Sequence, residues 1–400
     1  MTDLFWPGDH RGGDLMSDTA FLAAMAEVEN AWLAVLVDAA VAPEAASADL
    51  ASLVSSADVE AIAAGAEADG NPVIGLLALL RERAGGEAAH WLHRGLTSQD
   101  VVDTAMMLCL RDGLSRIESE IATQVSTLAA LAETHHHAPM LARTLTQPAL
   151  PSTVGMKMAN WLSGVLDAAD AVAALPGLPV QAGGAAGTLA AATELTGSAG
   201  EAVALSGRLA TAVGLADAGP WHTTRSVITR VGDALVTCCD AWGHIAADVA
   251  TGSRPEIGEL TEGRGGGSST MPHKNNPVLS VLIRRASVAA PALGATLHSA
   301  SAASVDERSD GGWHTEWATL RTLTRRTIVA AAQTTELLAG LVVDTDRAAA
   351  NLAAAGDLLA EQRSMTELTG RAALSSYTGA IDHLIDAALQ RARHHLKEAT

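Results

Sequence analysis

The stretch Leu110–Leu131, LRDGLSRIESEIATQVSTLAAL, decides the fold class of this chain. Its apolar residues recur in steps of three or four: Leu110, Leu114, Ile117, Ile121, Val125, Leu128 and Leu131. Such a period places them on one face of an α-helix. A second series has the same steps and contains no proline: Val227, Val231, Leu235, Cys238, Trp242, Ile245 and Val249. Helices of this length exceed the globular norm and favour an extended bundle.

Further segments with a helical period cover Phe21 to Ala40, Ser152 to Ala174, Pro277 to Ala290 and Trp313 to Leu352. Alternating runs of β-branched residues are hard to find, so we predict an all-α protein without a substantial sheet. Breaks rich in glycine and proline predict loops at Pro176–Gly187, Gly252–Gly267 and Ser304–Gly312. We expect an N-terminal helical domain over residues 1–96, a central long-helix bundle over 97–353 with a loop at 263–277, and a shortened C-terminal helical domain over 354–400.

The composition excludes several classes of protein. Of 400 residues, 48% are hydrophobic but only 3% aromatic, and alanine dominates, so the helices must approach closely through small side chains. The net charge of −19 and the lack of any Lys or Arg run argue against nucleic-acid binding. The N-terminus has no signal-peptide pattern, and the longest apolar runs fall short of a membrane span. We expect a cytoplasmic protein.

Cysteine and histidine give no metal-ligand spacing. Cys109, Cys238 and Cys239 are interpreted as reduced thiols in the core. The run His135–His137 invites a metal interpretation, but consecutive residues of a helix point in different directions and cannot all converge on one ion. We therefore interpret the run as a solvated helix end, and we predict neither a metal nor an organic cofactor.

The segment TSQD, Thr97–Asp100, opens the first long helix. Thr97 and Asp100 fit a capping box, in which each side chain pairs a free backbone N–H of the first turn. A helix N-terminus also attracts anions, and Ser98 and Gln99 add side-chain donors there. A simple cap and a carboxylate site both remain open interpretations.

The most informative motif is GSSTMPHKNNP, Gly267–Pro277, at the end of a glycine run. A flexible linker would account for the glycines, but not for Ser268, Lys274 and Asn276 at fixed offsets. Serine is a poor base at its free pKa and needs a nearby cation, for which Lys274 is the obvious candidate. Asn276 and Pro277 are typical residues for the start of the next helix.

Two further polar segments precede helices. In PWHTTR, His222 and Arg225 share one helix face with Thr229, and this face could meet an anion or be merely solvated. The segment Arg143–Pro148, RTLTQP, says little by itself.

Together these residues resemble a known superfamily. GSSTMPHKNNP is similar to the signature loop of the fumarase, aspartase, argininosuccinate lyase and adenylosuccinate lyase superfamily, and the resemblance extends from about Ser17 to Leu359. The segments HRGLTSQD, Arg143–Thr144 and Gln147 agree in the same order. TSQDVVDTA, PWHTTR and ERSDGGWHTEW look most like the 3-carboxy-cis,cis-muconate cycloisomerase branch.

The resemblance implies a small polycarboxylate substrate and a homotetramer whose active sites are shared between subunits. It also implies that Ser268 exchanges a proton at the carbon next to a carboxylate, while Lys274 and Asn276 stabilise the charge that develops there. The remaining implied substrate-binding residues are His93, Thr97, Ser98, Gln99, Thr144, Gln147, His222, Arg225, Ser269, Met271 and Arg308.

Two positions depart from the pattern of the lyase relatives. Those relatives carry a general-acid histidine directly after the Arg-Thr pair, where this chain has Leu145, and the region beyond Glu361 is shorter than usual. Leu145 favours a cycloisomerase over an adenylosuccinate lyase-like enzyme that releases fumarate from an N-substituted succinate. A helical scaffold without activity is a third hypothesis, which the retained Ser268, Lys274 and Asn276 disfavour.

Overall fold

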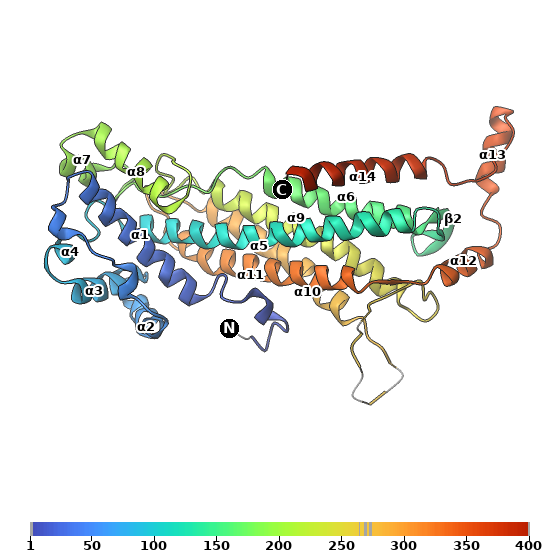
Figure 1. The fold of residues 1–400 in the computed structure, drawn as a ribbon, viewed down its shortest axis with the longest axis horizontal. Coiled ribbons are helices and arrows are strands. Elements are labelled where there is room, and N and C mark those ends of the chain that lie inside the picture. Colours follow the sequence, from blue (N-terminus) through green and yellow to red (C-terminus); the bar gives the residue numbers. More distant parts are fainter. Residues whose placement is uncertain (1–2, 264, 268–269, 272–273, 399–400) are drawn as a thin grey trace. The chain divides into compact units, whose positions relative to one another are not determined.

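Long α-helices joined by loops make up the structure, a computed structural model that describes residues 3–263, 265–267, 270–271 and 274–398 (Figure 1). The α-helices are α1 (Asp18–Asp38), α2 (Val59–Asp69), α3 (Val73–Ala84), α4 (Gly86–Trp91), α5 (Ser98–Thr134), α6 (Val154–Ala173), α7 (Ala190–Thr196), α8 (Ala199–Val213), α9 (Ser226–Gly252), α10 (Val278–Ala302), α11 (Gly312–Ala339), α12 (Thr345–Ala354), α13 (Ala360–Thr369) and α14 (Ile381–Glu398). Short 3-10 helices lie at Asp9–Gly12, Glu44–Ala46, Ala51–Leu53 and Ser56–Asp58. The strands β1 (Pro139–Thr144) and β2 (Gln147–Thr153) form one antiparallel ribbon, and β3 (Leu260–Thr261) and β4 (Val342–Val343) form another. The prediction of an all-α protein without a substantial sheet is confirmed.

The chain divides into two units, and each of the long helices α5, α9, α10 and α11 contributes to both. Unit 1 comprises residues 1–116, 174–233 and 292–328, and unit 2 comprises residues 117–173, 234–291 and 329–400. This division follows packing rather than chain order. The boundaries at residues 96 and 353 that the sequence suggested stay a prediction.

The apolar periods locate the long helices correctly, but two of the predicted ends are wrong. The helix predicted to stop at Ala290 continues through Pro291 to Ala302, because proline removes only its own N–H bond and the surrounding turns hold the helix together. The helix predicted from Trp313 to Leu352 ends at Ala339. There Gly340 lies against Gly263 and the chain enters β4, which pairs with β3.

A buried polar side chain joins three long helices inside unit 2. Gln124 of α5 is fully buried, and its amide donates to the Ala331 carbonyl of α11 at 3.0 Å and to Thr335 Oγ1 at 3.1 Å. Its Oε1 accepts a hydrogen bond of 2.7 Å from Trp242 Nε1 of α9. Because a buried polar group is costly unless it is paired, these bonds fix which faces of α5, α9 and α11 meet.

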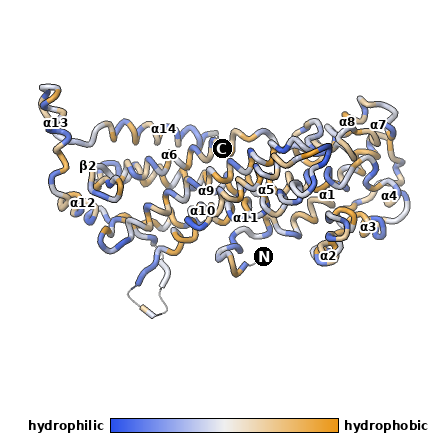
Figure 2. The backbone as a smooth tube through the Cα atoms, turned by 180° about the vertical axis from the view of Figure 1, so that it is seen from behind, coloured by the Kyte–Doolittle hydropathy of each residue, from blue (hydrophilic) through white to orange (hydrophobic). Residues whose placement is uncertain are grey.

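Small residues let neighbouring helices approach closely, as the alanine-rich composition predicts. A Cβ added at Gly243 of α9 would stand 2.4 Å from Ser287 of α10, and one added at Gly232 would stand 2.7 Å from Leu297. Such contacts leave no room for a larger side chain. Figure 2 shows hydrophobic and hydrophilic stretches alternating along these helices, as expected where only one face is packed.

The C-terminal helix α14 packs on α6 within unit 2 (Figure 1). Its apolar residues Ile385 and Leu389 are buried, and Arg391 pairs with Asp167 at 2.7 Å and with Asp170 at 2.6 Å. The last helix is therefore held to the body of unit 2.

All three cysteines are free and buried, which confirms their interpretation as core thiols. Burial raises the pKa of Cys109 to about 12, so this thiol stays protonated at neutral pH.

By length and hydropathy alone, α1 and α10 could each cross a membrane. The sequence-based statement that no apolar stretch is long enough is therefore too strong. This is weak evidence for a membrane protein, because 61% of the apolar window of α1 is buried inside the protein, as in the core helix of a soluble protein.

We predict that Gln124→Leu lowers the free energy of unfolding by about 1–3 kcal/mol, because the Trp242 N–H loses its acceptor while the side-chain volume is nearly unchanged. Thermal unfolding at a fixed protein concentration measures the effect. Thr123→Ala, at the exposed neighbouring position, is the control and should change stability by less than about 0.5 kcal/mol. Equal midpoints for the two variants would contradict the role of Gln124.

Candidate active site

The N-terminus of α5 is built around the buried carboxylate of Asp100 in unit 1. Asp100 accepts hydrogen bonds of 2.9 Å from the backbone N–H groups of Thr97, Gly183 and Gly184. The first of these is half of the predicted capping box. The other half is changed, because the Thr97 hydroxyl accepts from Arg308 Nη2 at 2.6 Å. The segment at Thr97 is thus both a helix cap and an anchor for a distant loop.

The imidazole of His222 completes this cluster. His222 is buried, its Nε2 lies 3.3 Å from Asp100 Oδ1, and its Nδ1 lies 2.9 Å from the amide nitrogen of Gln181. Gln181 Oε1 accepts from the Trp221 N–H at 2.8 Å, which fixes the orientation of the amide. The Gln181 nitrogen also lies 3.2 Å from His222 Nε2, and because an amide NH2 can only donate, the ring nitrogen that it bonds acts as the acceptor.

Glycine is required where the loop before α7 crosses this ring. A Cβ at Gly183 would stand 2.4 Å from Cε1 of His222 and 2.8 Å from Pro220. The glycine-rich loop predicted at Pro176–Gly187 therefore packs directly on His222. Gln181 in the same loop is a residue that sequence reasoning missed, since a lone glutamine before a glycine run carries no recognisable signal.

Arg225 does not present its charge to solvent. Its guanidinium is buried between Asp103 at 2.7 Å and Glu316 at 2.6 Å, and it stacks on the Trp221 ring at 4.7 Å. The remaining guanidinium N–H groups also bond these carboxylates and the His222 carbonyl. All of its donors are engaged within the single chain, and its contact with a substrate carboxylate stays a prediction.

The pKa values of Arg225 and Glu316 are both raised in this network. Burial would lower the pKa of the Arg225 guanidinium, but the carboxylates of Asp103 and Glu316 outweigh burial and raise this pKa. Burial raises the pKa of the Glu316 carboxyl, and Arg225 opposes that rise. Trp313 Nε1 also donates to Asp103 at 2.9 Å. A buried charge of this kind is tolerated only because it is paired and hydrogen-bonded.

Gln99 is a further buried residue of this network in unit 1. The side chain is fully buried, and its amide nitrogen donates to Asp103 Oδ2 at 3.2 Å and to the His222 carbonyl at 2.9 Å. Its Oε1 is buried without a hydrogen-bond partner among the described residues, and the contact of Gln99 with a substrate stays a prediction.

Arg308 provides an exposed positive charge beside Thr97. It lies on the loop between α10 and α11 and is exposed, and Nη2 is the nitrogen that bonds the Thr97 hydroxyl. Ser98, the first residue of α5, is half-buried beside Thr97. An exposed guanidinium next to the N-terminus of a long helix is a favourable place for a carboxylate.

His93 lies just upstream in a strained conformation. Its φ is +66°, in the left-handed region, and Nδ1 lies 2.6 Å from the buried Glu29 Oε1 of α1. The other carboxylate oxygen of Glu29 is buried without a hydrogen-bond partner among the described residues. Strain of this kind persists only where the surroundings hold it and is common at functional sites.

In unit 2, the residues Thr144 and Gln147 pair across the end of the β1–β2 ribbon. The two-residue turn between them is Leu145-Thr146, with φ of +49° and +71°. Positive φ at both positions is usual for Asn-Gly and unusual for leucine or a β-branched residue. The turn therefore stores strain, and Leu145 stands at its tip with 96% of its surface exposed.

The base of this ribbon is anchored in unit 2. Arg143 forms two parallel hydrogen bonds to the buried Glu259, of 2.7 and 2.9 Å, and Asn351 donates to the same carboxylate at 2.8 Å. A two-pronged pair of this kind fixes direction as well as distance. These contacts fix the base of the ribbon from which the turn extends.

The predicted catalytic loop of residues 263–277 is also closed at its base. Gly266 and Asn276 exchange backbone hydrogen bonds of 2.9 and 2.8 Å. The buried Glu262 accepts from the Leu279 N–H at 3.0 Å and so caps α10. Lys274 and Met271 are exposed, and Asn276 is half-buried. Ser268 and Ser269 lie outside the described residues.

Comparisons with known proteins bear on the family of the chain. Residues 18–291 match the sequence profile of the lyase family. Nitrosuccinate lyase of Streptomyces davaonensis is 42% identical over 367 residues, 88% of this chain and 77% of that protein. 3-carboxy-cis,cis-muconate cycloisomerase of Bradyrhizobium diazoefficiens is 38% identical over 390 residues, 94% of this chain and 83% of that protein. The crystal structure of the 3-carboxy-cis,cis-muconate lactonizing enzyme from Pseudomonas putida has a TM-score of 0.81 and 30% identity, over 97% of this chain and 87% of that one.

The chain belongs to the fumarase and aspartase superfamily. Its place is in the branch of the 3-carboxy-cis,cis-muconate cycloisomerases, and it is an enzyme. The hypothesis of a scaffold without activity is therefore set aside.

Within this superfamily member, the predicted site residues fall into two groups. Unit 1 brings His93, Thr97, Ser98, His222 and Arg308 to the beginning of α5 and the segments around it. Unit 2 carries Thr144 and Gln147 on the ribbon and Met271, Lys274 and Asn276 on the loop. Of the unit 1 group, His222 is buried with both ring nitrogens engaged, and its contact with a substrate stays a prediction.

We predict that Arg225→Met and Arg308→Met act on different properties of the enzyme. Arg225→Met leaves two buried carboxylates unpaired and should cost about 3–5 kcal/mol of stability. Arg308→Met removes an exposed side chain, so it should leave stability within about 0.5 kcal/mol and raise KM. Thermal unfolding and steady-state kinetics separate the two. A normally stable Arg225→Met variant with only a raised KM would instead support the predicted role of Arg225 in binding a substrate carboxylate.

Proposed function

We propose that this enzyme is a cofactor-free cycloisomerase that interconverts 3-carboxy-cis,cis-muconate and a carboxymuconolactone. One carboxylate of the substrate adds to the substrate's own double bond, and Ser268 delivers a proton to the carbon next to a second carboxylate. A C–O bond and a C–H bond form as the C=C π bond is lost. In the reverse direction Ser268 removes the proton and the carboxylate leaves. The activity would place the enzyme in the degradation of aromatic acids, in the cytoplasm.

The observation that carries this proposal is the apolar tip of the β1–β2 turn. Leu145 occupies the position at which lyase relatives carry their general-acid histidine, and its side chain cannot donate a proton. An amine is too basic to leave without protonation. A carboxylate, whose acid has a pKa of about 4, leaves readily as an anion. The tip therefore favours substrates whose leaving group departs as a stable anion.

A second candidate reaction satisfies the same constraint. Nitrosuccinate lyase is among the similar proteins, and a nitro group that leaves as nitrite is also a stable anion. The enzyme would then break the C–N bond, remove the neighbouring proton and release fumarate. This reaction is the form of the N-substituted succinate hypothesis that agrees with Leu145, whereas an amine leaving group does not agree with it.

The chain's charge requires local cations for either substrate. With a net charge of −19, the protein as a whole repels polycarboxylates. Lys274 and Arg308 are both exposed and can each meet a carboxylate. We assign Lys274 and Asn276 to the carboxylate next to the reacting carbon, where negative charge develops, and Arg308, Thr97 and Ser98 of a neighbouring subunit to another carboxylate. Thr144 and Gln147 would contact the substrate from the ribbon.

The exposed face of α10 supports the proposal of a homotetramer. Val281 and Val288, seven residues apart, are 56% and 78% exposed. Only 28% of the most apolar window of this helix is buried within the single chain. Apolar residues at this spacing form a stripe on one face of the helix, which fits packing against the helices of other copies of the chain.

We predict that Val288→Glu weakens the tetramer, because packing would bury its charge. Light scattering coupled to size exclusion should give four times 40.9 kDa for the unaltered protein and a smaller mass for the variant. Val203→Glu, at a valine of α8 that is 57% exposed, is the matched control and should keep the full mass. A tetramer that survives Val288→Glu would exclude this face as the interface.

To test the reaction, the enzyme is incubated separately with 3-carboxymuconate, nitrosuccinate and argininosuccinate while absorbance and nitrite are followed. Loss of the diene absorbance without nitrite is the expected result, and nitrite released together with fumarate would favour the second candidate. Turnover of argininosuccinate would contradict the leaving-group argument. Ser268→Ala should lower kcat by at least about 100-fold with unchanged stability, whereas Ser364→Ala, at an exposed serine of α13, should leave kcat unchanged.

A further inference from the structure

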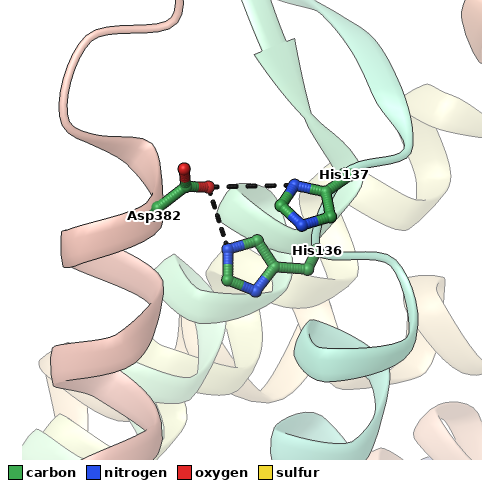
Figure 3. Close-up of side chains that lie close together, drawn as sticks. All are labelled: His136, His137 and Asp382. Atoms are coloured by element: carbon green, nitrogen blue, oxygen red, sulfur yellow. Dashed lines mark hydrogen bonds and ion pairs between the residues drawn. The ribbon is translucent and has the colours of Figure 1, made fainter.

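Two histidines and one aspartate converge where the end of α5 meets the beginning of α14 in unit 2 (Figure 3). His136 Nε2 lies 3.0 Å from Asp382 Oδ1, and His137 Nδ1 lies 3.8 Å from the same oxygen. The two imidazole rings are 4.4 Å apart between centroids and tilted by 34°. Both rings therefore direct a nitrogen toward one point beside the carboxylate.

This arrangement corrects the reason for which the sequence excluded a metal. On a helix, consecutive side chains are rotated far apart. However, α5 ends at Thr134, and His136 and His137 lie in the turn that follows. In a turn, neighbouring side chains can point in similar directions. The third ligand comes from a segment more than two hundred residues away, which no local pattern could reveal.

The spacing of the three ligand atoms suits a small divalent ion. Zinc binds imidazole nitrogen and carboxylate oxygen at about 2.0–2.2 Å in a tetrahedron, which puts neighbouring ligand atoms about 3.3–3.5 Å apart. The observed separations of 3.0 and 3.8 Å lie on either side of this value. All three ligand atoms lie within 4.8 Å of one another, so small side-chain movements complete the geometry.

We propose that His136, His137 and Asp382 bind one divalent transition-metal ion of the zinc class, with water as the fourth ligand. The side chains of His137 and Asp382 are 83% and 71% exposed, which leaves the ion open to water. Imidazole and carboxylate together are ligands suited to this class of ion, and the negative charge of the protein raises the local concentration of cations.

The bound ion would tether the beginning of α14. The other end of this helix is already held to α6 by Arg391 and its two aspartates. The ion would replace the weak, exposed contacts of Asp382 with coordination bonds to both histidines. The site takes no part in the isomerisation proposed above, so its role is to stabilise the C-terminal helix.

The test uses the full chain without a polyhistidine tag, stripped with a chelator and titrated with Co²⁺ and Zn²⁺. We expect one equivalent of metal per chain, with the visible absorption bands of tetrahedral Co²⁺, and a rise in the unfolding midpoint on adding Zn²⁺. His136→Ala and Asp382→Ala should each weaken binding at least about tenfold and remove the rise. His395→Ala, also on α14 but outside the cluster, should bind as the unaltered protein does.

The variants change side chains at a helix end, and circular dichroism of the metal-free proteins checks that each one folds. Metal binding that persists at full affinity in the His136→Ala/Asp382→Ala double variant would overturn the proposal, as would unaltered protein that binds no more tightly than this variant. Binding and unfolding are measured without substrate, so a failure here is distinct from a failure of the proposed reaction.

Discussion

The unit 1 part of the site depends on the hydrogen bonds that the buried carboxylate of Asp100 accepts. It accepts the N–H of Thr97 at the beginning of α5 and those of Gly183 and Gly184 in a distant loop, and it faces the His222 ring. A buried carboxylate is stable only with such a complete set of partners. Because one group satisfies a helix end, a glycine loop and an imidazole together, none of the three can move independently.

The structure separates charges that hold the protein together from charges that are free to bind. Arg225, Asp103 and Glu316 neutralise one another inside unit 1, with every guanidinium donor engaged. Arg308 and Lys274 remain exposed on loops. For a strongly acidic protein this division matters, because the polycarboxylate substrate proposed above would be repelled by the overall field and attracted only by a few accessible cations. The sequence alone therefore does not show which arginine is buried in an ion pair and which is exposed.

In unit 2, the β1–β2 ribbon has a fixed base and a strained turn. The pair of Arg143 and Glu259 fixes the base of the ribbon. At its tip, Leu145 and Thr146 form a turn with positive φ at both residues. A strained turn of this kind is maintained by its surroundings at a cost of about 1–3 kcal/mol per residue. What it presents is an apolar side chain, which cannot donate a proton.

The sequence by itself determined the helical class, the long helices α5 and α9, the three loops and the loop motif around Lys274 and Asn276, because helical periods and glycine runs are local signals. It failed at Pro291 and Gly340, where tertiary packing decided whether a helix continued. Only the tertiary structure decided that Arg225 and Gln99 are buried and that Gln181 contacts His222. It also decided that Asp382 lies beside His136 and His137. These contacts join residues tens to hundreds of positions apart, and burial and partners at that range leave no periodic trace along the chain.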